Sequence, residues 1–163
     1  MERAIPRPTH PIRVAPRRRK RDNDAMASPR PADPIRDLLE RSRRVAGVGW
    51  SADPSRTSAR VASYLAQAGY DVTPVNPTAE RIDGRTSYPT LRDVPGHIDL
   101  VVVFRRSEDA APVVKDAIAV GVDAIWLQLD ITTPDGAAHA RAAGIAYVED
   151  HCVMVEHRRR FGG

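Results

Sequence analysis

Between residues 34 and 160, short apolar runs alternate with segments whose apolar residues recur every three or four positions. The runs predict strands and the spaced segments predict amphipathic helices. The predicted strands are 45–48, 71–75, 100–104, 124–129 and 145–148, with a further short strand at 86–88. Four predicted helices are 34–42, 58–68, 110–120 and 152–159. A further helix is predicted to begin after Thr133 and Pro134, which cap it, and to stop at Gly144.

This alternation is typical of a parallel sheet with helical crossovers. The run Leu100–Phe104 is apolar throughout, as expected for a central strand buried on both faces. Right-handed crossovers would give a Rossmann-like, doubly wound α/β sheet with helices on both faces. We expect a single domain with the strand order 3-2-1-4-5-6, in which 86–88 is the third strand.

The first part of the chain has a different composition. Residues 1–34 hold seven of the fourteen prolines and show almost no apolar periodicity. Such a segment buries too little surface to offset its ordering entropy, so residues 1–33 are predicted to be a disordered basic tail before a domain at 34–160. Met26 lies in this tail, and a second hypothesis is that the cellular protein starts there.

The positive charge of the chain is concentrated in that tail. Residues 1–25 carry eight basic and three acidic residues, whereas the whole chain has a net charge of +4, so residues 26–163 sum to −1. The predicted domain therefore lacks the excess of basic residues that is typical of a nucleic-acid-binding surface. Its apolar runs are too short to span a membrane, its single cysteine excludes an internal disulfide, and the Arg-rich start lacks a secretory signal. These features predict a cytoplasmic protein.

Candidate ligand-binding residues lie where the predicted strands end, because ligands of open α/β sheets bind beyond the carboxyl ends of the strands. Gly47-Val48-Gly49-Trp50-Ser51-Ala52 matches G-x-G-x-x-A between a strand and a helix. Glycines in this position let backbone N–H groups approach a pyrophosphate, and Arg56 and Ser58 add donors. An ordinary tight turn with helix-capping hydroxyls is the alternative interpretation.

The second strand ends in Val75-Asn76-Pro77, without the acidic residue that would hold the ribose of NAD. Arg81 is a candidate for a ribose phosphate, as in NADP or coenzyme A, or a solvated loop charge. Phe104-Arg105-Arg106-Ser107 places two guanidinium groups beside the first loop, where one of them could instead pair with Glu108 or Asp109. Gln128 adds a polar group at the same rim, and Trp126 is predicted to lie in the core.

Residues for catalysis or metal binding are few. Cys152 with His151 and His157 could suggest a thiolate and a base, but no third group supports them. Cys152 is better interpreted as a small side chain that helps to close the site. The same residues do not match a metal-ligand spacing, so no metal site is predicted.

Six segments together resemble the CoA-binding protein family, small YccU-type proteins related to the CoA-binding domain of the succinyl-CoA synthetase α subunit. They are 45–51, 54–58, 74–77, 103–107, 126–129 and 150–152, within a resemblance that extends from about Arg44 to Glu156. The resemblance implies that Gly47 and Gly49–Ser51, including Trp50, cradle the pyrophosphate of coenzyme A with Arg56 and Ser58. It implies that Asn76 and Pro77 flank the adenosine, and that Phe104, Arg105 and Gln128 line the rest of the groove.

The chain departs from the synthetases in two respects. They have a lysine shortly after the proline that matches Pro77, where this chain has Ala79, so Arg81 is the nearest base for a 3′-phosphate. They also continue into a ligase domain that carries the phosphorylated histidine. We therefore expect a non-catalytic protein that binds coenzyme A or an acyl-CoA in a sensing or regulatory role, with a protein partner left open. The alternative is an NADP-dependent oxidoreductase on the same fold.

Overall fold

The computed structural model describes residues 32–162, so the predicted tail, residues 1–31 of it, and the hypothesis about Met26 lie outside the described residues. Asp33 already belongs to the folded part. Its Oδ1 accepts a hydrogen bond from the Arg36 N–H (3.0 Å) and caps α1 (Pro34–Arg41), and its Oδ2 pairs with Arg160 at 2.8 Å. The domain therefore begins one residue before the predicted boundary.

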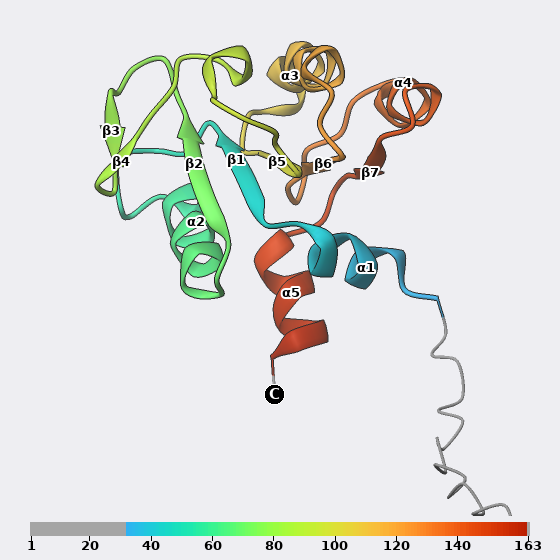
Figure 1. Cartoon of the computed structure of the whole chain (residues 1–163), viewed down its shortest axis with the longest axis horizontal. Helices are drawn as coiled ribbons and strands as arrows, with labels where there is room; N and C mark the ends of the chain where they lie inside the picture. Colours follow the sequence, from blue (N-terminus) through green and yellow to red (C-terminus); the bar gives the residue numbers. More distant parts are fainter. Residues whose placement is uncertain (1–31, 163) are drawn as a thin grey trace, which may run out of the picture. The chain divides into compact units, whose positions relative to one another are not determined.

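A five-stranded parallel sheet forms the centre of the fold (Figure 1). Its strands are β1 (Arg44–Val48), β2 (Asp71–Val75), β5 (Leu100–Val103), β6 (Ala124–Leu127) and β7 (Ala146–Val148), in the order β2-β1-β5-β6-β7. The pairing places Val48 beside Val75 on one side and beside Val103 on the other. The predicted Rossmann-like α/β fold is confirmed.

The predicted third strand is reduced to an isolated bridge at the edge of the sheet. Tyr88 forms one isolated parallel bridge with Val75, which lies in β2 at the edge of the sheet. Thr86 instead pairs with Arg81 in a small antiparallel hairpin of β3 (Arg81–Ile82) and β4 (Arg85–Thr86). The prediction of one strand at 86–88 was therefore wrong in its extent, because Thr86 ends the hairpin strand β4 and only Tyr88 pairs with β2.

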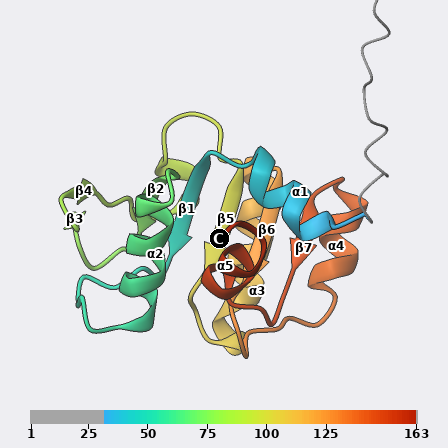
Figure 2. The ribbon, with the colours of Figure 1, turned by 90° about the horizontal axis from the view of Figure 1, so that it is seen from below.

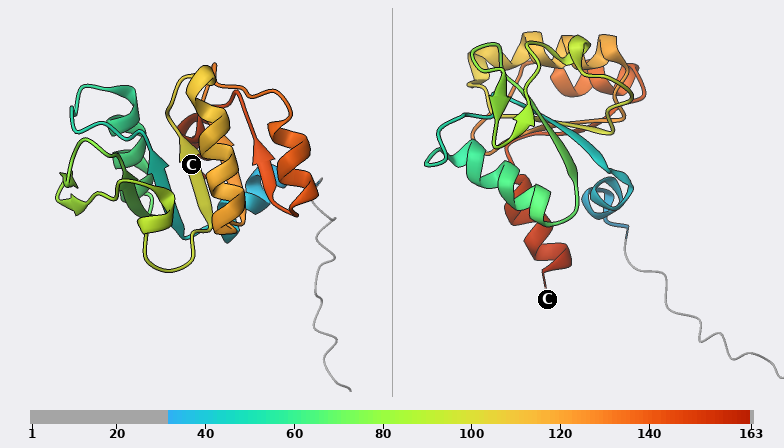
Figure 3. Two further views of the ribbon diagram at one scale, coloured as in Figure 1. Left: turned by 90° about the horizontal axis from the view of Figure 1, so that it is seen from above. Right: turned by 60° about the vertical axis from the view of Figure 1, so that its left-hand side comes forward.

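Helices cover both faces of the sheet. On one face lie α1, α2 (Thr57–Gln67) and α5 (Val153–Phe161), with α5 beside both α1 and α2 (Figure 2). On the other lie α3 (Ser107–Val120) and α4 (Gly136–Ala142), and the short helix η1 (Leu91–Asp93) packs against α3 (Figure 3). Strand side chains alternate between these layers: Leu100 and Val102 pack in the α2 layer and Val101 and Val103 in the α3 layer. All four are fully buried, as the apolar run predicts.

The starts of α3 and α4 differ from the predictions by more than one residue. Helix α3 begins at Ser107, three residues before the predicted start, so Pro112 lies inside the helix instead of near its start. Helix α4 begins at Gly136 after Asp135, which has a left-handed φ of 60°, and Thr133 does not cap it. The Thr133 hydroxyl instead hydrogen-bonds with the Tyr147 hydroxyl at 2.8 Å. None of the helices in residues 32–162 is both long and apolar enough to cross a membrane.

Candidate functional site

The direction in which successive strands are added to the sheet reverses between β1 and β5. The chain passes from β1 outward to β2 and then returns to the other side of β1, where β5 lies. A cleft of about 570 Å³ lies where these two strands end, which is where open α/β sheets bind ligands. Eight of the eleven residues proposed from the sequence line this strand-end cleft: Gly49, Ser51, Arg56, Ser58, Asn76, Phe104, Arg105 and Gln128.

The amino terminus of α2 opens on the cleft. Its N-cap residue, Arg56, makes no side-chain capping bond, and Thr57 and Ser58 of the first turn line the cleft. The first N–H groups of a helix have no partner within the helix and carry its positive dipole end. This turn is therefore suited to bind an anionic group in the cleft.

The glycine loop before α2 uses its own N–H groups internally. The Gly49 N–H donates to the Val75 carbonyl (2.9 Å), that of Trp50 to the Gly47 carbonyl (3.4 Å) and that of Ser51 to Ser58 Oγ (3.0 Å). The sequence pattern had pointed to these groups as phosphate donors. These bonds hold the loop against the start of α2, and the first turn of that helix lines the cleft through Thr57 and Ser58.

The two arginines that follow β5 have different surroundings. Arg106 is exposed and pairs with Glu108 at 3.4 Å and with Asp109 at 3.5 Å. Arg105 is half-buried, lines the cleft, and forms no ion pair with any residue in the described part of the chain. The sequence had left open which guanidinium would be available to a ligand, and the geometry favours Arg105.

Asn76 and Gln128 line the cleft and also support its walls. Asn76 Nδ2 donates to the Trp50 carbonyl (3.0 Å), and its Oδ1 accepts from the Thr78 N–H (2.9 Å) and hydroxyl (2.7 Å). Gln128 is 6% exposed, and its Oε1 accepts the Val153 N–H (2.9 Å) at the start of α5. Both amides thus join neighbouring loops to each other at the rim.

Three proposed residues lie outside the cleft lining. Pro77 is exposed beyond Asn76. Gly47 faces the α2 side of the sheet, where a Cβ would stand 3.5 Å from the Phe104 ring. Trp50 is 1% exposed and belongs to the core between the sheet and α2. Arg81, a candidate for a ribose phosphate, is likewise absent from the lining and donates to the Gly84 carbonyl.

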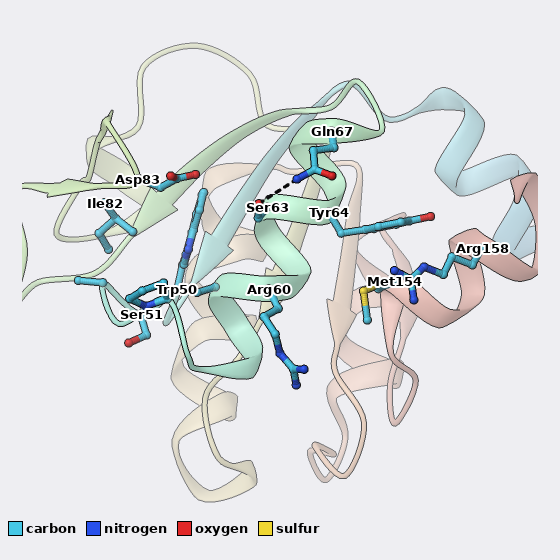
Figure 4. A pocket seen from close by; sticks show the side chains of 13 residues that line it. Trp50, Ser51, Arg60, Ser63, Tyr64, Gln67, Ile82, Asp83, Met154 and Arg158 are labelled. Carbon is cyan, nitrogen blue, oxygen red and sulfur yellow. Dashed lines mark hydrogen bonds between the residues drawn. The ribbon is translucent and has the colours of Figure 1, made fainter.

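Trp50 instead borders a second hollow of about 670 Å³ over α2. Trp50 and Ile82 lie on one side of it and Tyr64, Met154 and Arg158 on the other (Figure 4). This outer hollow is larger than the strand-end cleft, but none of its lining residues lies in the loops directly after β5 and β6. We therefore place the candidate site in the strand-end cleft, where the strand ends and the helix amino terminus converge.

Two lining residues, Leu129 and Ile131, had not been proposed from the sequence as ligand contacts. Leu129 was assigned to the strand 124–129, whereas β6 ends at Leu127 and Leu129 is 59% exposed in the next turn. Cys152 is the N-cap of α5, and its Sγ lies 3.7 Å from Gln128 Nε2. The Nδ1 atoms of the two nearby histidines bond elsewhere, His151 to the Glu149 carbonyl and His157 to the Tyr64 hydroxyl.

At the opposite end of the sheet, before β5 and β6, the described residues include one group of three side chains with metal-ligating atoms. His97 Nε2 lies 3.0 Å from Asp123 Oδ1 and 4.0 Å from Asp99 Oδ1. The other oxygen of Asp99 accepts the Arg43 and Arg44 N–H groups, at 2.7 and 2.8 Å, and so fixes the start of β1. This group is separate from the cleft.

Comparisons with known proteins agree with the geometry. The chain is 34% identical over 132 residues to the uncharacterized protein YneT of Bacillus subtilis (strain 168). The aligned region covers 81% of this chain and 97% of YneT. A hypothetical protein from Pyrococcus horikoshii OT3 has a similar structure, with a TM-score of 0.76, 37% identity and coverage of 78% and 90% of the two chains.

A larger protein contains a similar domain. The dinucleotide forming acetyl-coenzyme A synthetase 1 of Ca. Korarchaeum cryptofilum, solved with phosphate and ADP, matches 66% of this chain but only 25% of its own length. The TM-score is 0.59 and the identity 25%. The family model described as a CoA binding domain matches residues 43–158, which include the whole sheet and every residue that lines the cleft. This chain therefore belongs to the CoA binding domain family.

Proposed function

We propose that this protein binds coenzyme A in the strand-end cleft and acts as a cofactor-binding protein in a sensing or regulatory role. The observation that carries the proposal is that Arg105, which has no ion-pair partner among the described residues, shares the cleft with the uncapped first turn of α2. A guanidinium and a helix amino terminus are complementary to the pyrophosphate of a nucleotide cofactor. The family to which the chain belongs supports coenzyme A as that cofactor.

The end of β2 argues against NAD. Both polar ends of the Asn76 side chain are bonded, to the Trp50 carbonyl and to Thr78, and the residue lacks the carboxylate that would accept bonds from a ribose diol. We place the adenosine of coenzyme A beside Asn76 and Pro77. The rest of the cofactor would follow the cleft past Phe104 and Arg105 toward Gln128.

The arrangement around Cys152 supports a binding role without catalysis. A catalytic thiolate needs a base within hydrogen-bonding distance, whereas the only side chain that contacts Cys152 Sγ through a hydrogen bond among residues 32–162 is Gln128. We further propose that the protein functions in the cytoplasm, where the coenzyme would be available to it.

Titration calorimetry with coenzyme A, NADP, NAD and ADP tests the proposal. We expect coenzyme A to bind more tightly than NAD or NADP, and ADP to bind more weakly because it lacks the pantetheine arm. Tighter binding of NADP would instead support an oxidoreductase on this fold. Incubation with an acyl-CoA should release no free thiol, and measurable release would show that the protein is an enzyme.

A further inference from the structure

The two ends of the strand-end cleft differ in chemistry. At the β1 end, the lining includes Arg56, Arg105 and the hydroxyl groups of the first turn of α2. Beyond β5, it consists of Gln128, Leu129, Ile131 and Cys152, with no basic side chain. Because β5 separates β1 from β6 in the sheet, the cationic and apolar parts lie on opposite sides of Phe104. A ligand that fills the cleft should therefore be anionic at one end and apolar at the other.

Leu129 is exposed because of the turn in which it lies. The Ile131 N–H donates to the Gln128 carbonyl (3.0 Å), which closes a four-residue turn with Leu129 in its second position. Asp130 has a left-handed φ of 66°, and its N–H donates to Asp150 Oδ1 (2.8 Å). These bonds hold Leu129 at the tip of the turn, where polar residues are usual.

Only two large hydrophobic side chains among residues 32–162 are more than half exposed, Leu129 (59%) and Val155 (53%). Val155 lies on α5 and does not line the cleft, whereas Leu129 does. An apolar ligand group placed against Leu129 would remove its surface from water, which is favourable in proportion to the area covered. The position of Leu129 thus points to an apolar group at this end of the ligand.

The same turn opposes a negatively charged group. Asp130 and Asp150 are both exposed beside Leu129, and the lining there offers no cation to balance a further carboxylate. A carboxylate brought to this end would be repelled by two like charges. The acids therefore favour an uncharged group over one that ends in a carboxylate.

From this asymmetry we propose that the protein prefers acyl-CoA thioesters with a short, uncharged acyl chain, and that Leu129 is the residue that contacts the acyl group. The inference rests on the proposed binding of coenzyme A. The pyrophosphate lies at the first turn of α2 and Arg105, and the pantetheine arm crosses Phe104. The acyl chain then reaches Leu129 and Ile131, so that the protein distinguishes acylated from free coenzyme.

Titration calorimetry on the full chain with coenzyme A, butyryl-CoA and succinyl-CoA tests this preference. We expect butyryl-CoA to bind about tenfold more tightly than coenzyme A, as partial burial of its added carbons would give. Succinyl-CoA should bind no more tightly than coenzyme A. Leu129→Ser should reduce the ratio of butyryl-CoA to coenzyme A affinity to about one, whereas Val155→Ser, the matched control, should leave that ratio unchanged.

Asp130→Asn tests the role of charge, because asparagine tolerates the left-handed conformation of this position. It should raise the affinity for succinyl-CoA about threefold relative to butyryl-CoA through loss of one like-charge interaction. Equal binding of coenzyme A and butyryl-CoA by the wild-type protein, or a butyryl-CoA preference that survives Leu129→Ser, would overturn this inference and leave the proposed function intact. No binding of any of the three ligands would overturn both.

Discussion

The side chain of Arg105 lies across Gly49, so that a Cβ on Gly49 would stand 3.2 Å from Arg105 Nε and 3.3 Å from its Cδ. Gly49 has a φ of +83°, which side-chain-bearing residues rarely adopt. Its N–H is bonded to the Val75 carbonyl. Gly49 therefore contributes to the cleft by leaving the space in which Arg105 lies beside the first turn of α2.

Gly49→Ala should weaken binding of coenzyme A about tenfold or more, because the added methyl would displace the Arg105 guanidinium from the charge-assisted bond to phosphate that we propose. Gly84→Ala is the matched control. Gly84 also has a left-handed φ, of +72°, but a Cβ there would meet nothing within 4 Å. Each variant should lower the free energy of unfolding by about 1–2 kcal/mol, measured by urea denaturation. An equal loss of affinity in both would show that backbone strain, and not the contact with Arg105, is responsible.

Arg105→Ala should weaken binding of coenzyme A by about 1.5–3 kcal/mol, the usual contribution of a hydrogen bond to a charged group. Arg106→Ala should leave the affinity unchanged, because Arg106 pairs with Glu108 and Asp109. The Arg56 side chain is 74% exposed, and its Nε lies 3.9 Å from Asp53 Oδ2. Arg56→Ala should therefore reduce the affinity for coenzyme A less than Arg105→Ala does. Calorimetry at low and high salt measures all three, and a larger loss in Arg106→Ala would reassign the phosphate contact.

Gln128→Ala should lower the free energy of unfolding by about 1–3 kcal/mol, because it leaves the Val153 N–H at the start of α5 without its partner. Gln128→Glu keeps the acceptor oxygen and should be less destabilising. Gln67→Ala serves as the control, since Gln67 is exposed and forms a single bond of 3.4 Å to Ser63. Thermal melts compare the three variants. A loss no greater than that of Gln67→Ala would show that Gln128 does not hold α5 in place.

The stability of the protein should fall as the pH is lowered from about 7 to about 5.5. His157 accepts or donates at Nδ1 with the Tyr64 hydroxyl, packs edge-on against Tyr64 and Tyr70, and lies beside Phe161. Burial lowers the pKa of His157 below the ordinary histidine value near 6.5. In this interval the unfolded chain therefore binds more protons than the folded protein, and acid favours unfolding.

Melting temperatures at the two pH values measure this effect. His157→Gln should reduce the difference between them, whereas His139→Gln, at an exposed position on α4, should preserve it. A wild-type difference that persists in His157→Gln would assign the acid sensitivity to other groups.

The sequence by itself determined the layers of this protein. The apolar run Leu100–Phe104 marked a central strand, and 71–75 was predicted with the bounds that β2 has. The G-x-G-x-x-A pattern and Phe104-Arg105 predicted a ligand site where β1 and β5 end, and the structure has a cleft there. These features are local in the chain, because hydrophobic periodicity reports which face of an element is buried. The rule that open α/β sheets bind ligands where the strand order reverses then predicts the position of the site.

Tertiary structure decided the role of each residue within that frame. Trp50 and Arg105 both belong to predicted loops, yet one is buried under α2 and the other lines the cleft. Asn76 and Gln128 hold neighbouring loops in place, and Leu129 is exposed at the tip of a turn. No local pattern contains this information, because a side chain's partners come from segments distant in sequence, such as the Val75 carbonyl for Gly49 and the Val153 N–H for Gln128.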